Sequence, residues 1–261
     1  MTAPIQTVLV TGAAQGVGLA TATLLAQRGY RVILLDIKPV DAQVAELRRA
    51  GATVEGMSGD VSLEIFVKQV AQRIGRDHGA LDALVNNAGI SLIVPAEETS
   101  AEQWQRVMAV NLLGPFLLCR YLGAQMLERR RGSIVNVASV AGLSGISHRS
   151  AYNASKHGLI GLTQTLAAEW GGRGVRVNAV CPGWVKTEMD SADQGGGAYS
   201  DADIVDRVPM ARFARAQDVA EAIAFLVDYE RNGFINGVSL PVDGGWLADA
   251  SWTSLRLRTR L

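Results

Sequence analysis

The fold is decided by residues 7–20, which read TVLVTGAAQGVGLA. The first four residues are β-branched or aliphatic and are typical of a buried strand, and a glycine-rich turn follows them directly. Small apolar residues then continue in a pattern that favours a helix. A strand, a tight turn and a helix in this order predict the first unit of a parallel α/β sheet.

The same alternation continues along the chain. Seven apolar runs predict strands at residues 7–10, 31–35, 53–54, 83–85, 134–137, 175–180 and 238–242. Six amphipathic stretches predict helices at 17–27, 41–50, 62–78, 101–130, 152–170 and 217–227. We therefore expect an α/β fold with a Rossmann-type, doubly wound parallel sheet of about seven strands and helices on both faces. No linker or internal repeat divides residues 1–261, so we expect a single domain.

Composition excludes several classes of protein. The 25 basic and 25 acidic side chains cancel, so we expect no nucleic-acid partner and no membrane partner. Cys119 and Cys181 lie far apart without a CxxC spacing, and the 3 histidines are scattered, so we expect no metal site. Residues 1–27 carry no charge but are interrupted by polar and glycine-rich positions, which disfavours a signal peptide and favours a cytoplasmic protein.

The glycine-rich turn is the first motif that carries chemistry. Gly12, Gly16 and Gly18 have the spacing G-x-x-x-G-x-G, between the first strand and the first helix. Glycines allow the backbone to approach a ligand closely, and the N–H groups at a helix start bind a pyrophosphate. We expect a dinucleotide here, with Gln15 and Val17 beside the phosphates; Gln15 stands where a basic residue would favour an extra phosphate.

Asp36 ends the second predicted strand, 18 residues beyond Gly18. A carboxylate at this place accepts hydrogen bonds from a ribose 2′-hydroxyl and repels a 2′-phosphate, which favours NAD over NADP. Asp36 could instead only cap the next turn, and Lys38 would weaken the discrimination.

A second group of residues follows the fifth predicted strand. Ser139 comes just after that strand, and Tyr152 and Lys156 stand four residues apart at the start of the next helix, on one helical face. An ammonium near a phenol lowers the phenol pKa and makes tyrosine usable as a base. Taken alone, such a pair is also typical of an ordinary solvated helix face.

Together these motifs resemble the classical short-chain dehydrogenase/reductase family over about residues 7–246. Further matching positions carry the resemblance. They are Asp60, Val61, Asn86, Asn87, Ala88, Gly89, Asn111, Pro182, Gly183, Trp184, Val185, Lys186, Thr187, Asp243, Gly244 and Gly245. The resemblance implies an enzyme that interconverts a secondary alcohol and a ketone with a nicotinamide cofactor, and an assembly that is a homotetramer.

The resemblance also implies roles for individual residues. Tyr152 would be the general acid/base, and Ser139 would hydrogen-bond the substrate oxygen. Lys156 would bind the nicotinamide ribose and lower the tyrosine pKa, and Asn111 would hold a water that relays protons. The cofactor would lie against a wider set. This set is Gly12, Gln15, Gly16, Val17, Gly18, Asp36, Asp60, Val61, Asn87, Ala88, Gly89, Pro182, Gly183, Val185 and Thr187.

The substrate is less well defined by the sequence. We expect contacts from Ser139, His148, Tyr152, Trp184 and a substrate loop at about 190–212, in which residues 195–197, Gly-Gly-Gly, would form a lid or an ordinary surface loop. A polar surrounding favours a small hydroxylated substrate such as a sugar, a polyol or a hydroxy acid. His148 and its neighbour Arg149 could equally be solvated.

Two other functions remain open at this stage. One is an NADPH-using 3-oxoacyl carrier-protein reductase, with Arg129, Arg130 and Arg131 docking the acidic carrier; those arginines also suit a helix C-terminus. The other is a redox sensor that binds NAD(H) without turnover. The tail at 247–261 alternates leucine and arginine near its end and would pack as an edge strand, pack against a neighbouring subunit, or fray.

Overall fold

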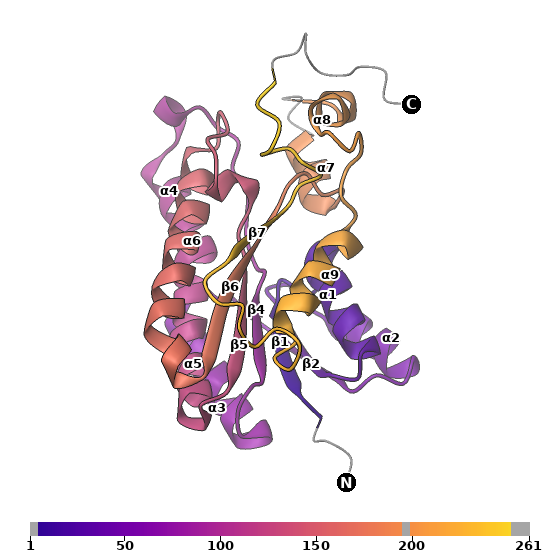
Figure 1. Ribbon diagram of the computed structural model, residues 1–261, viewed down its shortest axis with the longest axis vertical. Helices are drawn as coiled ribbons and strands as arrows, with labels where there is room; N and C mark the ends of the chain where they lie inside the picture. Colours follow the sequence, from indigo (N-terminus) through magenta and orange to yellow (C-terminus); the bar gives the residue numbers. More distant parts are fainter. Residues whose placement is uncertain (1–4, 195–198, 252–261) are drawn as a thin grey trace.

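The computed structural model describes residues 5–194 and 199–251 (Figure 1). Within them, seven parallel strands form one sheet in the order β3-β2-β1-β4-β5-β6-β7. The strands are β1 (Thr7–Thr11), β2 (Arg31–Asp36), β3 (Val54–Ser58), β4 (Ala83–Asn86), β5 (Gly132–Val137), β6 (Val175–Pro182) and β7 (Ser239–Val242). The predicted doubly wound parallel sheet is therefore confirmed, with a strand at each of the seven predicted places.

Helices cover both faces of this sheet (Figure 1). One face carries α1 (Gly16–Gln27), α2 (Asp41–Arg49) and α9 (Ala216–Val227). The other carries α3 (Glu64–His78), α4 (Ala101–Met108), α5 (Gly114–Arg129) and α6 (Ser150–Trp170). A π-helical turn, Ala109–Leu113, joins α4 to α5, so the helix expected at 101–130 is not regular throughout.

The core follows from the two-residue period of a strand. In β1, Val8 and Val10 pack into the apolar cluster under α1 and α9, whereas Leu9 points into the cluster under α3 and α5. All six residues of β5 are buried. A strand that is covered on both faces must be apolar throughout, which explains the continuous apolar runs in the sequence.

The stretch Ala101–Glu128 is long and apolar enough to cross a membrane by length and composition alone. In the structure, 56% of its most apolar window is buried inside the protein. Leu118 and Leu122 of α5, for example, belong to the cluster that covers β1 and β4. The apolar character of this stretch thus reflects packing against the sheet.

Two further helices stand beyond the carboxyl ends of the strands, at the top of Figure 1. These are α7 (Glu188–Gln194) and α8 (Asp201–Arg207). The expectation of a loose segment from residue 190 was therefore wrong for residues 190–194, which complete α7. An ion pair between Lys186 and Asp190 holds its first turn, and Ser200 begins α8 with a capping box to Asp203.

Two sequence predictions lie outside the described residues. The lid expected at 195–197 falls in the gap between α7 and α8. Most of the tail expected to pack or to fray, residues 252–261, follows the last described residue, Ser251.

Candidate active site

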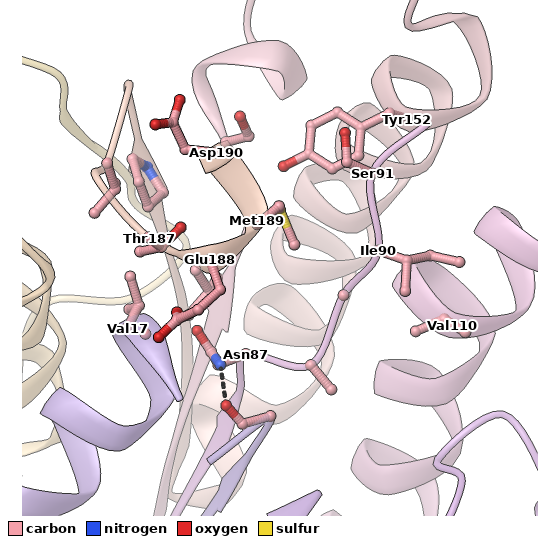
Figure 2. A pocket seen from close by; sticks show the side chains of 18 of the residues that line it. Val17, Asn87, Ile90, Ser91, Val110, Tyr152, Thr187, Glu188, Met189 and Asp190 are labelled. Atoms are coloured by element: carbon pink, nitrogen blue, oxygen red, sulfur yellow. Dashed lines mark hydrogen bonds between the residues drawn. The ribbon is translucent and has the colours of Figure 1, made fainter. Parts of the chain in front are cut away.

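A cavity of about 620 Å³ runs along the carboxyl ends of the strands. Its wall begins at the turn between β1 and α1, passes the ends of β2, β4 and β5, and finishes at α7. Figure 2 shows side chains from these elements converging on one space, with Val17 and Asn87 at one end and Ser91 and Tyr152 at the other. Residues that are distant in the sequence therefore share one pocket, at the place where open α/β sheets bind ligands.

The glycine turn has a left-handed backbone that favours glycine. Gly12 and Gly16 have φ of +65° and +56°, and both line the cavity. A Cβ on Gly12 would lie 2.8 Å from Asn87 Nδ2. Gly18 does not line the cavity; a Cβ there would lie 2.0 Å from the Gly12 carbonyl oxygen, so this glycine lets α1 pack against the turn.

Asn87 fixes the turn from the end of β4. Its Nδ2 donates to the carbonyl oxygens of Thr11 and Gly12 at 2.9 and 3.1 Å (Figure 2). The Thr11 hydroxyl oxygen accepts the backbone N–H groups of Asn87 and Ala88, each at 3.0 Å. Ala88 and Gly89 then line the cavity wall. Asn87 therefore holds the cradle in shape and also borders the cavity.

Asp36 is buried at the rim of the cavity. Its Oδ2 accepts the N–H of Ala14 and its Oδ1 accepts the N–H of Lys38, both at 2.9 Å. The carboxylate therefore ties the glycine turn to β2, which is the capping role, and at the same time it lines the cavity. Lys38 Nζ donates to Gln15 Oε1 at 2.7 Å, so a cation also stands at this rim.

Asp60 and Val61 follow β3 and line the same end of the cavity. Burial raises the pKa of Asp60, but hydrogen bonds from Ser62 and the Arg106 guanidinium outweigh that effect, and the pKa falls below its usual value. Arg106 Nη1 lies 3.0 Å from Asp60 Oδ2. Arg106 comes from α4 and lines the cavity too, which the sequence analysis did not anticipate.

Ser139, Tyr152 and Lys156 meet in the middle of the cavity. Burial raises the pKa of Tyr152, while a hydrogen bond with Ser139 and the charge of Arg149 lower it. Ser139 Oγ accepts the N–H of Ala141 at 3.1 Å. Lys156 Nζ lies 5.6 Å from the Tyr152 ring centre and donates to the Val137 carbonyl oxygen at 2.8 Å. The sequence prediction that these three residues lie together is thus met by the geometry.

Burial has a strong effect on Lys156, which is 4% exposed. It lowers the pKa of Lys156 from its usual 10.5 to about 8. The cation that acts on the Tyr152 pKa in the structure is Arg149, three residues earlier, rather than the expected Lys156.

Asn111 lies fully buried in the π-helical turn. Its Oδ1 accepts the N–H of Ile90 and its Nδ2 donates to the carbonyl oxygen of Ile90, both at 2.9 Å. Nδ2 also lies 3.1 Å from Ser155 Oγ. The side chain therefore clamps the segment after β4 to α6 beside Lys156. The water relay expected of Asn111 stays a prediction.

The segment after β6 closes the other side of the cavity. Its predicted cofactor residues, Pro182, Gly183, Val185 and Thr187, all line the wall. Gly183 packs closely, since a Cβ there would lie 2.9 Å from the Asp243 Cα.

Of the two predicted substrate residues outside the catalytic group, only Trp184 lines the cavity. His148 is exposed, has φ of +61°, and is not part of the wall. Its neighbour Arg149 is buried and lines the cavity instead. The left-handed turn at residue 148 separates the two side chains, and this turn leaves no trace in the residue types.

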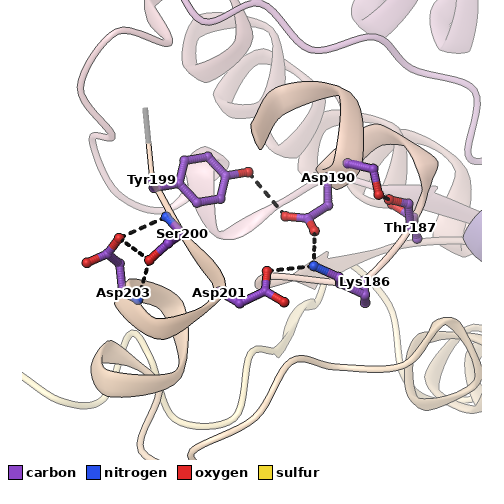
Figure 3. A network of polar contacts seen from close by, with 8 residues as sticks. Lys186, Thr187, Asp190, Tyr199, Ser200, Asp201 and Asp203 are labelled. Atoms are coloured by element: carbon purple, nitrogen blue, oxygen red, sulfur yellow. Dashed lines mark hydrogen bonds and ion pairs between the residues drawn. The ribbon is translucent and has the colours of Figure 1, made fainter. Parts of the chain in front are cut away.

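Several lining residues were missed by sequence reasoning. Ser91 follows β4, and Glu188 and Met189 begin α7 (Figure 2), whereas Asp193 lies within the substrate loop that was expected at about 190–212. Figure 3 shows how α7 is held: Asp190 pairs with Lys186 and accepts a hydrogen bond from Tyr199 at 3.2 Å. None of these residues belongs to a motif with a characteristic spacing. The only feature of the sequence that could have indicated them is their position close to the end of a predicted strand.

The three arginines considered as a carrier dock lie away from the cavity. They precede β5, whose six residues span about 20 Å before Ser139. Arg129 pairs with Asp82 at 3.6 Å, and Arg131 pairs with Glu230 at 2.6 Å. Arg130 closes α5 in the left-handed conformation. These contacts match the helix-terminus interpretation.

The residues present fit a nicotinamide dinucleotide. A backbone cradle that a Cβ would fill borders the glycine turn, and a carboxylate stands at the rim where a ribose hydroxyl would bind. A phenol hydrogen-bonded to a serine stands further along the same cavity. Among the residues that the structure describes, no group of three or more His, Cys, Asp or Glu side chains could hold a metal ion.

Known proteins are similar to this chain in sequence and fold. The family model described as enoyl-(acyl carrier protein) reductase matches residues 12–247. The D-threitol dehydrogenase of Mycolicibacterium smegmatis is 40% identical over 91% of each chain. The cis-4-hydroxycyclohexanecarboxylate dehydrogenase of Sinomonas cyclohexanicum is 39% identical over 92% of this chain and 96% of its own.

A solved structure of actinorhodin polyketide ketoreductase with NADPH superposes with a TM-score of 0.89 and 34% identity, over 93% of this chain and 97% of its own. The fold, the glycine turn at the cavity and the sequence similarity over nine-tenths of the chain all agree. The chain belongs to the classical short-chain dehydrogenase/reductase family and is an oxidoreductase of alcohol and ketone substrates.

Proposed function

We propose that the protein is an NAD(H)-dependent oxidoreductase that interconverts a secondary alcohol and a ketone on a small hydroxylated substrate. The observation that carries the proposal is the position of Tyr152. Its phenol is hydrogen-bonded to Ser139, with Lys156 beside its ring, in the cavity that also contains the glycine turn. A phenol placed this way gives its proton to a ketone oxygen, or takes the proton of a hydroxyl group.

The chain's own residues handle the proton and the charge. Because the Ala141 N–H already donates to Ser139 Oγ, the serine keeps its own proton for the substrate oxygen. That hydrogen bond stabilises the negative charge that develops there in the transition state. Lys156 is held by the Val137 carbonyl oxygen, and the Arg149 guanidinium stabilises the phenolate that Tyr152 becomes. A bound nicotinamide supplies or accepts the hydride.

The raised pKa of Tyr152 sets an expectation for pH. In the free protein, burial keeps the phenol protonated at neutral pH, the form that donates a proton to a ketone. We expect ketone reduction to proceed at pH 7 and alcohol oxidation to accelerate as the pH rises towards 10. Initial rates in both directions between pH 6 and 10 measure this, and an oxidation rate that falls over that range would contradict the assignment of Tyr152 as the base.

The preference for NAD over NADP rests on Asp36. Its carboxylate lines the cavity at the rim, where it would repel a 2′-phosphate. Lys38, bonded to Gln15, works in the opposite direction. We expect a higher kcat/KM with NAD than with NADP, and a loss of this preference in Asp36→Asn. Equal kcat/KM values with both cofactors in the native protein would refute the discrimination by Asp36.

A small hydroxylated substrate is favoured by the polar end of the cavity and by the relatives. Ser91, Arg149 and Asp193 line that end. The names of the relatives contain a four-carbon polyol and a hydroxylated carboxylate. A spectrophotometric screen at 340 nm with NAD and NADP against polyols, sugars, hydroxy acids, simple alcohols and ketones tests the substrate class.

The decisive variant is Tyr152→Phe, which removes one oxygen atom. Loss of the general acid should lower kcat by about 10² to 10⁴-fold, while NADH binding, followed by fluorescence, persists. The matched control is Tyr30→Phe, because Tyr30 precedes β2 at the amino end of the strands. Full turnover in Tyr152→Phe would refute the mechanism. NADH binding without turnover of any carbonyl compound by the native protein would favour the redox-sensor alternative.

The second candidate is an NADPH-using 3-oxoacyl carrier-protein reductase. The description of the matching family model shares the acyl carrier protein with this candidate, and the cation of Lys38 at the cavity rim favours NADPH. The paired arginines at the amino end of β5 argue against a carrier dock. NADPH-dependent reduction of acetoacetyl thioesters, faster than that of any alcohol or ketone in the screen, would replace the first candidate.

We also propose a homotetramer in a reducing compartment such as the cytoplasm. Leu113 and Phe116 are exposed just before and at the start of α5, and Phe225 is exposed on α9, which covers the opposite face of the sheet; Phe234, after α9, is exposed as well. Two separate apolar surfaces suit a tetramer with two kinds of twofold interface. Light scattering tests this, with Phe116→Asp and Phe234→Asp each expected to give dimers. The free Cys119 and Cys181 agree with a reducing compartment.

A further inference from the structure

A carboxylate-binding site lies next to the catalytic tyrosine, and one of the protein's own carboxylates occupies it. Asp193 of α7 places Oδ2 3.0 Å from Arg149 Nη2 and 3.0 Å from the hydroxyl of Ser91. Arg149 Nη1 in turn donates to the Ser91 hydroxyl at 2.8 Å. A guanidinium and a hydroxyl that converge on one oxygen form the kind of charge-assisted site that binds carboxylates tightly.

The two partners of this ion pair are anchored differently. Arg149 directly precedes α6, its carbonyl oxygen accepts the Asn153 N–H at 2.7 Å, and its backbone forms a β-bridge with Val94. It therefore belongs to the same rigid segment as Tyr152. Asp193 stands near the end of α7, a helix of seven residues.

The position of Arg149 directs its charge at the reaction centre. The guanidinium carbon lies 5.5 Å from the Trp184 ring centre and 5.9 Å from that of Tyr152. All three residues line the cavity. A ligand group on Arg149 would therefore be separated by only a few carbon atoms from a reacting carbon at the Tyr152 hydroxyl.

Burial decides what can replace Asp193 on the arginine. The side chain of Arg149 is 7% exposed and that of Asp193 is 15% exposed. If Asp193 moves outward its carboxylate is hydrated, whereas a buried guanidinium left without a counter-ion is strongly unfavourable. The replacement must therefore be another anion.

The neighbouring charged side chains already have partners of their own. Asp190 pairs with Lys186, and Tyr199 donates to it, so this carboxylate does not compete for Arg149 (Figure 3). Trp184 Nε1 is buried and has no hydrogen-bond partner among the described residues. The end of the cavity near Arg149 thus has hydrogen-bond donors in excess, which suits an acceptor-rich ligand.

We propose that the substrate is a short hydroxy acid or oxo acid whose carboxylate replaces that of Asp193 on Arg149 and Ser91 while its reacting carbon lies at Tyr152. The inference rests on the proposed alcohol–ketone activity and narrows its substrate class. Asp193 then acts as an internal stand-in for the substrate carboxylate, and α7 shifts when that carboxylate binds.

The test compares each acid with its uncharged amide. We would measure kcat/KM for short 2-, 3- and 4-hydroxy acids and the corresponding hydroxy amides in the native protein, Arg149→Gln, Arg149→Lys and Asp193→Asn. The acid should be preferred over its amide, and Arg149→Gln should reduce this preference by about 10- to 100-fold, mainly through KM. Arg149→Lys should retain part of it, since the charge remains. Asp193→Asn should raise kcat/KM for the acid, because the competing carboxylate is gone.

The matched control is Arg131→Gln, whose arginine pairs with Glu230 at 2.6 Å at the far end of β5. This variant should keep the native preference. An unchanged acid-to-amide ratio in Arg149→Gln would overturn the inference. So would equal losses for acid and amide in both Arg149→Gln and Asp193→Asn, because the ion pair would then only hold α7 in place. A selective loss of neutral polyols in Asp193→Asn would also overturn it, since Asp193 would then bind hydroxyl groups directly.

A binding measurement separates this inference from the proposed function. Butyrate, but not butyramide, should quench the fluorescence of the native protein, because Trp184 lies beside Arg149. Arg149→Gln should lose this response. If no alcohol or ketone is turned over, the proposed function fails, and butyrate binding still tests the carboxylate site. If amides and neutral alcohols are turned over but butyrate does not bind, only the carboxylate site is refuted.

Discussion

Replacing Lys156 with methionine should make the protein more stable at neutral pH while it removes activity. The Lys156 side chain is 4% exposed, and its Nζ donates to the Val137 carbonyl oxygen at 2.8 Å. Methionine has nearly the same length and volume without the ammonium group. Lys156→Met therefore removes a buried charge without opening a large cavity.

The size of this stability change follows from the pKa of Lys156. Burial lowers it from 10.5 to about 8, and each pH unit corresponds to about 1.36 kcal/mol, so holding the charged form costs about 3 kcal/mol. The lost hydrogen bond to Val137 returns about 1 kcal/mol of this. We expect a net gain of about 2 kcal/mol at pH 7, which for a domain of this size raises Tm by about 4 to 8 °C.

The higher stability of Lys156→Met should disappear at high pH. Between about pH 8 and 10.5, the lysine is neutral in the folded protein and protonated in the unfolded chain. The unfolded state then binds more protons, so the native protein gains stability as the pH rises through this window. Above pH 10.5 both states are neutral, and the advantage of Lys156→Met is gone.

Thermal unfolding of cofactor-free protein at one fixed concentration, at several values between pH 6.5 and 10.5, measures this difference. Lys68→Met is the control, since Lys68 is an exposed lysine on α3 and its removal should produce no step in the same window. A Lys156→Met protein that is less stable than the native one at pH 7 would refute the reasoning. So would a gain that stays constant up to pH 10.5.

Three further changes have equally direct outcomes. Gly18→Ala places a Cβ 2.0 Å from a backbone carbonyl oxygen, so little folded protein should be recovered on expression, and a normal Tm would contradict the close packing. Glu188→Gln should tighten NADH binding several-fold in a fluorescence titration, because Glu188 Oε2 lies 3.4 Å from the Cβ position of Gly16; weaker binding would indicate that the carboxylate assists the cofactor. Burial raises the pKa of Cys119 to about 12 and of Cys181 to about 11, so neither should react with iodoacetamide in the folded protein at pH 8. Rapid labelling, detected by mass spectrometry, would show that one of them is accessible.

The sheet could be predicted because each strand carries its own signal. β5 and β6 are buried on both faces, and a doubly covered strand must be continuously apolar. The glycine turn and the pair Tyr152 and Lys156 were also predictable, since their spacing in sequence maps directly onto a turn and onto one face of a helix.

The helices over the site could not be predicted in the same way. Residues 188–194 read EMDSADQ, which has no apolar stripe, so α7 depends on contacts with distant residues such as the Arg149–Asp193 ion pair. Those two residues are 44 positions apart, and no periodic pattern relates them.

The choice between two adjacent residues was also beyond the sequence. Both His148 and Arg149 were possible substrate contacts and His148 was the one chosen, whereas only Arg149 lines the cavity. The difference arises from the backbone at residue 148, where φ is +61°. A single left-handed residue redirects the side chains on either side of it, and although histidine is enriched at positive φ, such residues are too uncommon for the turn to be predicted from the residue type.

The π-helical turn at Ala109–Leu113 has a consequence for how the long helix contacts its neighbours. One residue advances an α-helix by about 100°, so a single inserted residue rotates everything after it by that angle. Before the turn, α4 packs against α6; after it, α5 packs against α3. Asn111 sits where this change of phase occurs and is fixed to Ile90 and Ser155. Deleting one residue from this turn would leave a regular α-helix. It would also rotate the apolar face of α5 relative to Asn111, so that the two could no longer make their present contacts together.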